Sequence, residues 1–152
     1  MVMIPASPGA ANASYYDYTK NFALFVAHNQ EYLIEAPRIV VQNGIDKAYA
    51  RSLGKKLDGN ATKIGVKLKK YGFDVANVEN AIDTSTGTIV YIIGTGEYTE
   101  TINTLKYFVP ITSVVQAESG QLLTATTETD LVIVLGNDYL DKTAGKFFSY
   151  YK

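Results

Sequence analysis

The stretch Pro37-Arg-Ile-Val-Val-Gln-Asn-Gly44 decides the fold that we predict for this chain. Pro37 disfavours helical geometry in the residue before it, and the β-branched run after it predicts a strand over 38–42. An Asn-Gly pair often closes a hairpin, but here the next strand-like run is far away and the intervening segment has helical composition. Asn43-Gly44 therefore predicts a turn from a strand into a helix.

The rest of the chain continues this alternation. After a helical segment over 46–57, apolar residues at helical spacing predict a helix over 61–71 that stops at Gly72. A second helix is predicted over 99–108, with Thr99 as its N-cap and Pro110 as its end. Alternating or continuous apolar runs predict further strands over 73–78, 88–93, 111–116 and 131–135.

The order of these elements predicts the fold class. It is an α+β fold of the order βαββαββ, with a ferredoxin-like or split-βαβ sheet and helices packed mainly on one face. Before this unit, the apolar positions over 17–36 favour a short amphipathic helix. The alternation of Phe22, Leu24 and Val26 also suits a strand.

Composition narrows the class of protein. The chain has 152 residues, 47% of them hydrophobic and 19% charged, which predicts one ordered domain. A net charge of −1 gives no general attraction to nucleic acid, so we expect no nucleic-acid partner. The absence of cysteine excludes disulfides and thiolate chemistry. No apolar run is long enough to cross a bilayer, so this chain itself is not expected to insert into a membrane.

Few residues suit catalysis or metal binding. His28 is the only histidine and has no second histidine or cysteine to share a metal with. Gly94-Thr-Gly96 precedes a predicted helix but lacks the rest of a phosphate-binding motif, and Gly136-Asn-Asp-Tyr139 has too few carboxylates for calcium. We expect no catalytic residue, metal or cofactor. A hydrolase or transferase is disfavoured because no pair among the scattered carboxylates has a suitable spacing, these being Glu97, Glu100 and Asp138.

Lysines crowd the helical region between Gly44 and Gly72, whereas acids dominate later in the chain. Such a basic helix face can hold an anionic polymer by Coulombic attraction, although a solvated helix face is the more common reason for such a pattern. The candidate polymer-binding residues are Lys55, Lys56, Lys63, Lys67 and Lys70.

Three segments, in this order, resemble the C-terminal domain of LytR-type (LytR–CpsA–Psr) cell-envelope proteins. They are Ile39-Val-Val-Gln-Asn-Gly44, then Leu68-Lys-Lys-Tyr-Gly-Phe-Asp-Val75 with Asn80-Ala81, and finally Asp130-Leu-Val-Ile-Val-Leu-Gly-Asn-Asp-Tyr139. The segment over 46–60 is longer than is usual in that family.

The resemblance implies a division of the chain and a role. We expect a linker or cloning remnant over 1–14, a helical lead-in over 15–37, the LytR-like domain over 38–139 and a tail over 140–152. The resemblance implies a non-catalytic accessory or binding domain of an extracytoplasmic, membrane-anchored parent protein. Its expected partner is a wall glycopolymer, peptidoglycan or an envelope protein.

A structural role is the alternative. Tyrosines gather near both ends of the chain, and tyrosine suits protein interfaces because it has a large apolar face and a polar tip. This pattern suggests an oligomerisation domain that mediates protein–protein contacts, including a homo-oligomer. The tyrosines in question are Tyr15, Tyr16, Tyr18, Tyr150 and Tyr151.

Overall fold

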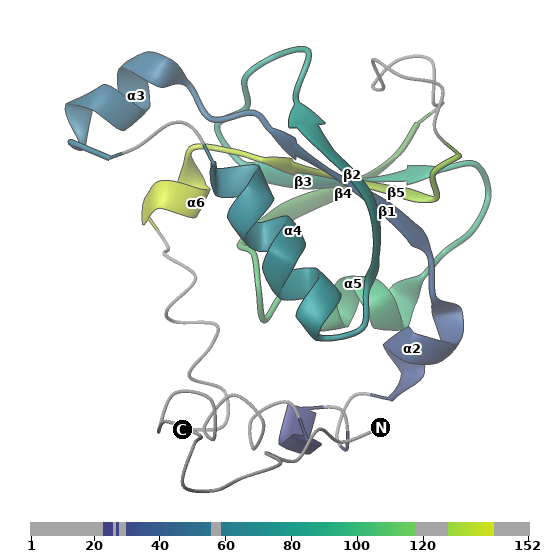
Figure 1. Cartoon of the computed structure of the whole chain (residues 1–152). Helices are drawn as coiled ribbons and strands as arrows, with labels where there is room; N and C mark the ends of the chain where they lie inside the picture. Colours follow the sequence, from purple (N-terminus) through teal and green to yellow (C-terminus); the bar gives the residue numbers. More distant parts are fainter. Residues whose placement is uncertain (1–22, 26, 28–29, 56–58, 118–127, 142–152) are drawn as a thin grey trace, which may run out of the picture.

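The computed structural model describes residues 23–25, 27, 30–55, 59–117 and 128–141, and Figure 1 shows helices packed on one mixed sheet. Within these described residues the sheet has five strands. The predicted α+β class and strand–helix order are confirmed. In chain order the elements are α2 (Glu31–Glu35), β1 (Arg38–Asn43), α3 (Lys47–Ser52), α4 (Asn60–Lys70), β2 (Asp74–Asn80), β3 (Thr88–Ile93), α5 (Thr99–Leu105), β4 (Ile111–Ala117), β5 (Leu131–Leu135) and α6 (Asp138–Asp141).

The sheet consists of two βαβ units joined by the last strand. Its order is β2-β1-β5-β3-β4. β1 and β2 pair in parallel, as do β3 and β4, so each unit has its own helical crossover. β5 lies between them, parallel to β1 and antiparallel to β3. The two units therefore meet only through β5 within the sheet.

The turn at Asn43-Gly44 leads from β1 into α3, as predicted. Asp46 caps this helix, since its carboxylate accepts a hydrogen bond of 3.0 Å from the backbone N–H of Ala48. α4 then ends at Lys70, and Gly72 takes the left-handed conformation with φ of 92° that closes many helices.

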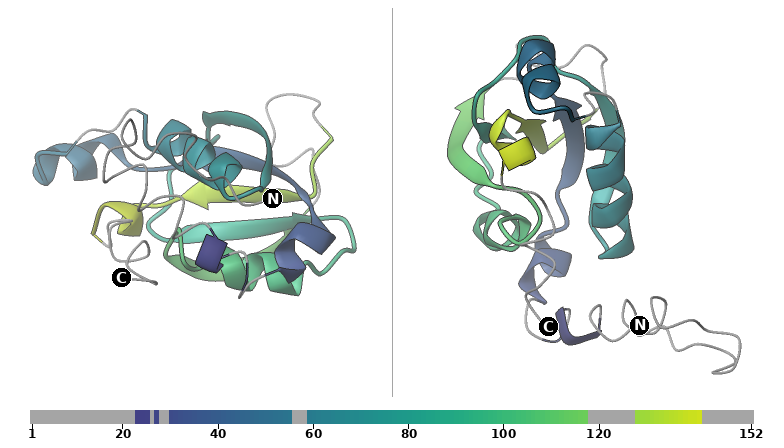
Figure 2. Two further views of the ribbon diagram at one scale, coloured as in Figure 1. Left: turned by 60° about the horizontal axis from the view of Figure 1, so that its bottom comes forward. Right: turned by 90° about the vertical axis from the view of Figure 1, so that its left-hand side faces the viewer.

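The helices cover one face of the sheet, as predicted. Buried residues of α2, α3, α4, α5 and α6 share a single apolar cluster with Ile39, Val41 and Ile133. The opposite face has its own small cluster around Val40 and Val132, to which no described helix contributes a buried residue. Figures 1 and 2 show α3 and α6 at one end of the sheet, and α2 and α5 at the other.

An aromatic cluster fills the end of the core near α2. Phe108 has edge contacts with the rings of Phe25, Tyr71 and Phe73, with centroids 5.1–5.7 Å apart. Tyr32 stacks on Phe73, and its hydroxyl donates to the Tyr71 carbonyl. Burial raises the pKa of Tyr32 far above its usual value.

The lead-in is helical where it is described, over 23–25, 27 and 31–35. Phe25 and Tyr32 are buried there, but Ile34 is 82% exposed and does not belong to the apolar face predicted for this helix. Phe22 and Val26, two of the three residues whose alternation suits a strand, lie outside the described residues.

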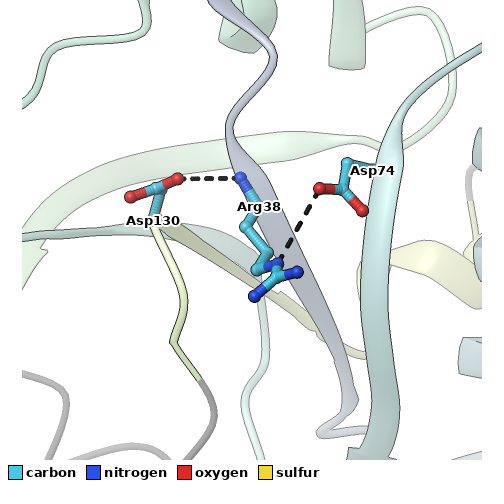
Figure 3. A network of polar contacts seen from close by, with 3 residues as sticks. All are labelled: Arg38, Asp74 and Asp130. Carbon is cyan, nitrogen blue, oxygen red and sulfur yellow. Dashed lines mark hydrogen bonds and ion pairs between the residues drawn. The ribbon is translucent and has the colours of Figure 1, made fainter.

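A polar network fixes the register at the start of β1 (Figure 3). Arg38 and Asp130 bond twice, since the Arg38 N–H donates to the Asp130 carboxylate at 2.9 Å and the Asp130 N–H donates to the Arg38 carbonyl at 2.8 Å. The Arg38 guanidinium also lies 3.8 Å from the Asp74 carboxylate on β2. Both side chains of this ion pair are about half exposed, so the backbone bonds matter more for stability.

The N-terminus of α5 differs from the prediction. Thr99 is the first helical residue and not the N-cap; that position belongs to Tyr98, which has a left-handed φ of 49° and offers no side-chain cap. The Glu35 carboxylate, at the end of α2, instead accepts from the backbone N–H groups of Glu100 at 3.2 Å and Thr101 at 2.6 Å. A residue distant in sequence therefore caps α5, which a local pattern does not reveal.

We expect Glu35→Ala to destabilise the domain by about 1–3 kcal/mol, because two backbone donors at a helix N-terminus lose a charged acceptor. Chemical denaturation with a two-state fit measures this change. Glu97→Ala, which removes the same charge from an exposed position, is the matched control. Equal stability of the two variants would contradict the capping role.

Candidate functional site

α4 brings three of the predicted lysines together. Lys63, Lys67 and Lys70 follow one another at helical spacings of four and three residues, which places them on one side of the helix. The pKa of Lys67 is lowered by partial burial and by the positive charges of Lys70 and Lys63. We call these three residues the lysine face.

The lysine face is turned away from the edge of the sheet. Gly65 lies against β2, where a β-carbon on it would come within 2.8 Å of the Val78 side chain. At 3.6 residues per turn the three lysines lie roughly 140–160° around the helix from Gly65. Lys63 and Lys70 are exposed and Lys67 is half-buried.

The other two candidate lysines do not extend this face. The Lys55 ammonium donates a hydrogen bond to the carbonyl of Leu140 in α6, which ties the segment after α3 to α6. Tyr49 supports the same contact, because its hydroxyl donates to the Asp141 carboxylate at 2.6 Å. Lys56 lies outside the described residues, as does His28.

Two of the family-like motifs meet at the end of the sheet that carries α3 and α6. The Gly44 N–H donates to the Leu135 carbonyl at 2.9 Å, and the Ser85 N–H donates to the Gly44 carbonyl at 2.7 Å. Gly136 lies directly on the backbone of Gly87, where a β-carbon would be 2.3 Å from the Gly87 carbonyl carbon. We call this contact between the ends of β1 and β5 and the loop over 85–87 the motif junction.

The polar side chains of the motif junction are occupied within the fold. The Asp138 carboxylate accepts from the Thr88 N–H at 3.1 Å and from its hydroxyl at 2.7 Å, and the amide oxygen of Asn137 accepts from the Asp46 N–H at 2.8 Å. Across the described ranges, no group of three or more acidic or histidine side chains is placed to hold a metal ion. These residues organise backbone turns.

The structure does not bring the scattered carboxylates together. Asp138 lies at the motif junction, whereas Glu100 is in the first turn of α5, near the opposite end of the sheet (Figure 1). Gly94-Thr-Gly96 forms a turn into α5, and the helical N–H groups of Glu100 and Thr101 are already bonded to Glu35. The carboxylate of Glu35 therefore occupies the N-terminus of α5, where an external anion would otherwise bind.

A pocket that the sequence did not reveal lies on the opposite face of the sheet from the helices. It has a volume of about 260 Å³ and combines an aromatic ring, a carboxylate, hydroxyls and aliphatic groups. The pocket and the lysine face are on opposite sides of the sheet and do not form one site. The lining residues are Gln42, Ala81, Ile82, Asp83, Thr84, Ser85, Ile89, Tyr91 and Val134.

The fold is that of a small α+β domain. At its motif junction the side chains of Asn137 and Asp138 accept hydrogen bonds from backbone N–H groups of the domain. The model of one protein family, described as LytR cell envelope-related transcriptional attenuator, matches residues 36–139. The chain belongs to this cell-envelope-related family, which is one of accessory domains and is not a known catalytic family. No curated protein and no solved structure matches the chain.

In the part of the chain that the structure describes, every helix is too short or too polar to cross a bilayer. The family assignment accounts for all three motif segments, since each lies within the matched range.

Proposed function

We propose that this chain is a non-catalytic accessory domain of an extracytoplasmic envelope protein that holds an anionic wall polymer on the lysine face. The observation that carries the proposal is the convergence of Lys63, Lys67 and Lys70 on one side of α4, where partial burial and then the charges of Lys70 and Lys63 lower the pKa of Lys67. The three ammonium groups repel one another in the folded domain, which disfavours their charged forms. An anion bound between them would offset this repulsion.

The length of the lysine face suits an extended polyanion. Lys63 and Lys70 are separated by about 10 Å along the helix axis, since each residue rises about 1.5 Å. A polymer with repeating phosphate or carboxylate groups can meet two or three of these ammonium groups at once, whereas a small anion meets fewer. Multivalent contact of this kind gives useful retention from individually weak pairs.

The helix supports this role because its opposite side is firmly packed. Ile64 and Leu68 are fully buried, and Ala61 is nearly so. The backbone that carries the lysines is therefore held against the sheet. Membrane anchoring belongs, in this proposal, to the parent protein.

We expect the triple variant Lys63→Gln, Lys67→Gln, Lys70→Gln to lose retention on isolated bacterial cell walls by roughly 10- to 100-fold. The estimate rests on about 1 kcal/mol or less for each lysine near an anionic surface. Co-sedimentation with wall material over a range of salt concentrations measures it. Retention of the unchanged chain should fall with salt, and walls stripped of phosphate-linked polymers by acid should retain it poorly.

The matched control is Lys47→Gln, Arg51→Gln, Lys106→Gln, which removes the same charge from exposed positions on α3 and after α5. If both triple variants lose equal retention, net charge and not the lysine face is responsible, and the proposal is wrong. Thermal melts add a second readout. Lysines that served only the C-terminal end of α4 would lower the melting temperature when neutralised, whereas a mutually repelling binding face would not.

A further inference from the structure

We infer that the outer edge of β4 is a self-association site, at which two copies of this chain pair their β4 strands antiparallel around a twofold axis. Among the described strands β4 pairs only with β3, so no described strand covers the backbone N–H and C=O groups of its other edge. This inference is independent of polymer binding.

The two edges of the sheet are built differently. β2, the other edge, carries Asp74 and Glu79, and an extra residue shifts its register against β1 between Ile39 and Val40. Charges and bulges are common protections of an exposed edge against further pairing. The outer edge of β2 is therefore protected against pairing with a further strand.

β4 lacks these protections over most of its length. Its sequence Ile111-Thr-Ser-Val-Val-Gln-Ala117 has no charged residue and no proline. Its register shift lies at the start, beside Thr112, and Ser113 to Ala117 then follow β3 regularly. Thr112 to Gln116 are all exposed, with Val114 at 45% and Val115 at 42%.

A second copy of the chain suits this edge better than a charged partner. An uncharged strand provides no electrostatic selection of a different protein, and it creates no repulsion between identical strands. Val114 pairs with Val90 on the helix-bearing side and Val115 pairs with Tyr91 on the other, so both faces of the joined sheet would gain apolar contacts between copies. Closed twofold symmetry is also the commonest arrangement of identical subunits.

A twofold axis restricts how the two β4 strands can pair, whereas random collision between copies does not. The axis exchanges the two strands. Residues directly opposite one another in antiparallel strands point to the same face of the sheet, whereas neighbours along one strand point to opposite faces, so one residue of β4 must lie opposite its own copy. Cysteines at that residue would be within disulfide range, whereas cysteines one position away would pair less readily.

The chain contains no cysteine, so single substitutions test this directly. We expect one of Ser113→Cys, Val114→Cys and Val115→Cys to form a disulfide-linked dimer under mild oxidation at least about tenfold faster than the others. Asn77→Cys on β2 and Ile82→Cys, which is 57% exposed in the parent, are the controls for random collision. Equal rates at all five positions would overturn the inference.

Sedimentation velocity of the unmodified chain supplies the second measurement. We expect a concentration-dependent dimer that Val115→Lys dissociates, because two ammonium groups then approach across the axis, while Ile82→Lys leaves it intact. Circular dichroism shows whether each variant is folded. A monomer at every concentration, or a dimer equally insensitive to both lysine substitutions, contradicts pairing through β4.

Discussion

Gly136→Ala is expected to destabilise the domain by about 3 kcal/mol or more and to lower its melting temperature by roughly 6–12 °C. The added β-carbon would lie 2.3–2.4 Å from the carbonyl group of Gly87, and both partners are backbone atoms that no side-chain rotation can move aside. The Gly136 N–H also donates to the Thr88 hydroxyl at 3.1 Å, so a shift of this residue breaks a buried bond. Thermal and denaturant unfolding measure the effect.

Gly94→Ala is the control that distinguishes the steric clash of an added β-carbon from the backbone strain of a left-handed conformation. Gly94 has a left-handed φ of 87° but no atom within 4 Å of its β-carbon position, so alanine there costs only about 1 kcal/mol of backbone strain. A loss for Gly136→Ala no greater than that for Gly94→Ala would show that the motif junction relaxes to admit a methyl group.

Phe108→Ala is expected to cost about 3–5 kcal/mol, the usual range for removing a buried aromatic ring. Phe108 is 2% exposed and touches three other rings of the aromatic cluster, so its loss leaves a cavity between α5 and the end of α4. Denaturant midpoints and near-ultraviolet circular dichroism should both change, since the neighbouring tyrosines lose their fixed environment.

Two further variants sharpen the Phe108 result. Phe108→Leu keeps most of the volume and should cost less than half as much as alanine. Ile34→Ala removes an apolar side chain that is 82% exposed and should change stability by about 0.5 kcal/mol or less. If Phe108→Ala behaved like Ile34→Ala, the aromatic cluster would not be part of the stabilising core.

Local chemistry accounts for the parts of the fold that were predicted correctly. Pro37 and the β-branched run after it mark β1, Gly72 marks the end of α4, and the apolar run before Gly136 marks β5. The convergence of Lys63, Lys67 and Lys70 also follows from helical spacing alone. Each of these signals acts over a few residues and needs no knowledge of the neighbouring elements.

The features that were missed depend on residues far apart in the chain. The capping of α5 by Glu35 joins residues that are 65 and 66 positions apart, and Lys55 contacts Leu140 across 85 positions. The pocket combines Gln42, the loop over 81–85 and Val134, and becomes visible only once the strand order is known. The strand order itself follows from pairing across the whole domain.

The central position of β5 determines when the sheet can be completed as the domain folds during synthesis. Every residue of this strand is buried, and it alone connects β1 to β3, yet among the described strands it is the last to leave the ribosome. Until Leu135 has emerged, the two βαβ units each keep an unpaired inner edge and cannot join. The described sheet is therefore completed only after nearly the whole matched domain has been synthesised, and until then the inner edges of the two units are open to premature strand pairing.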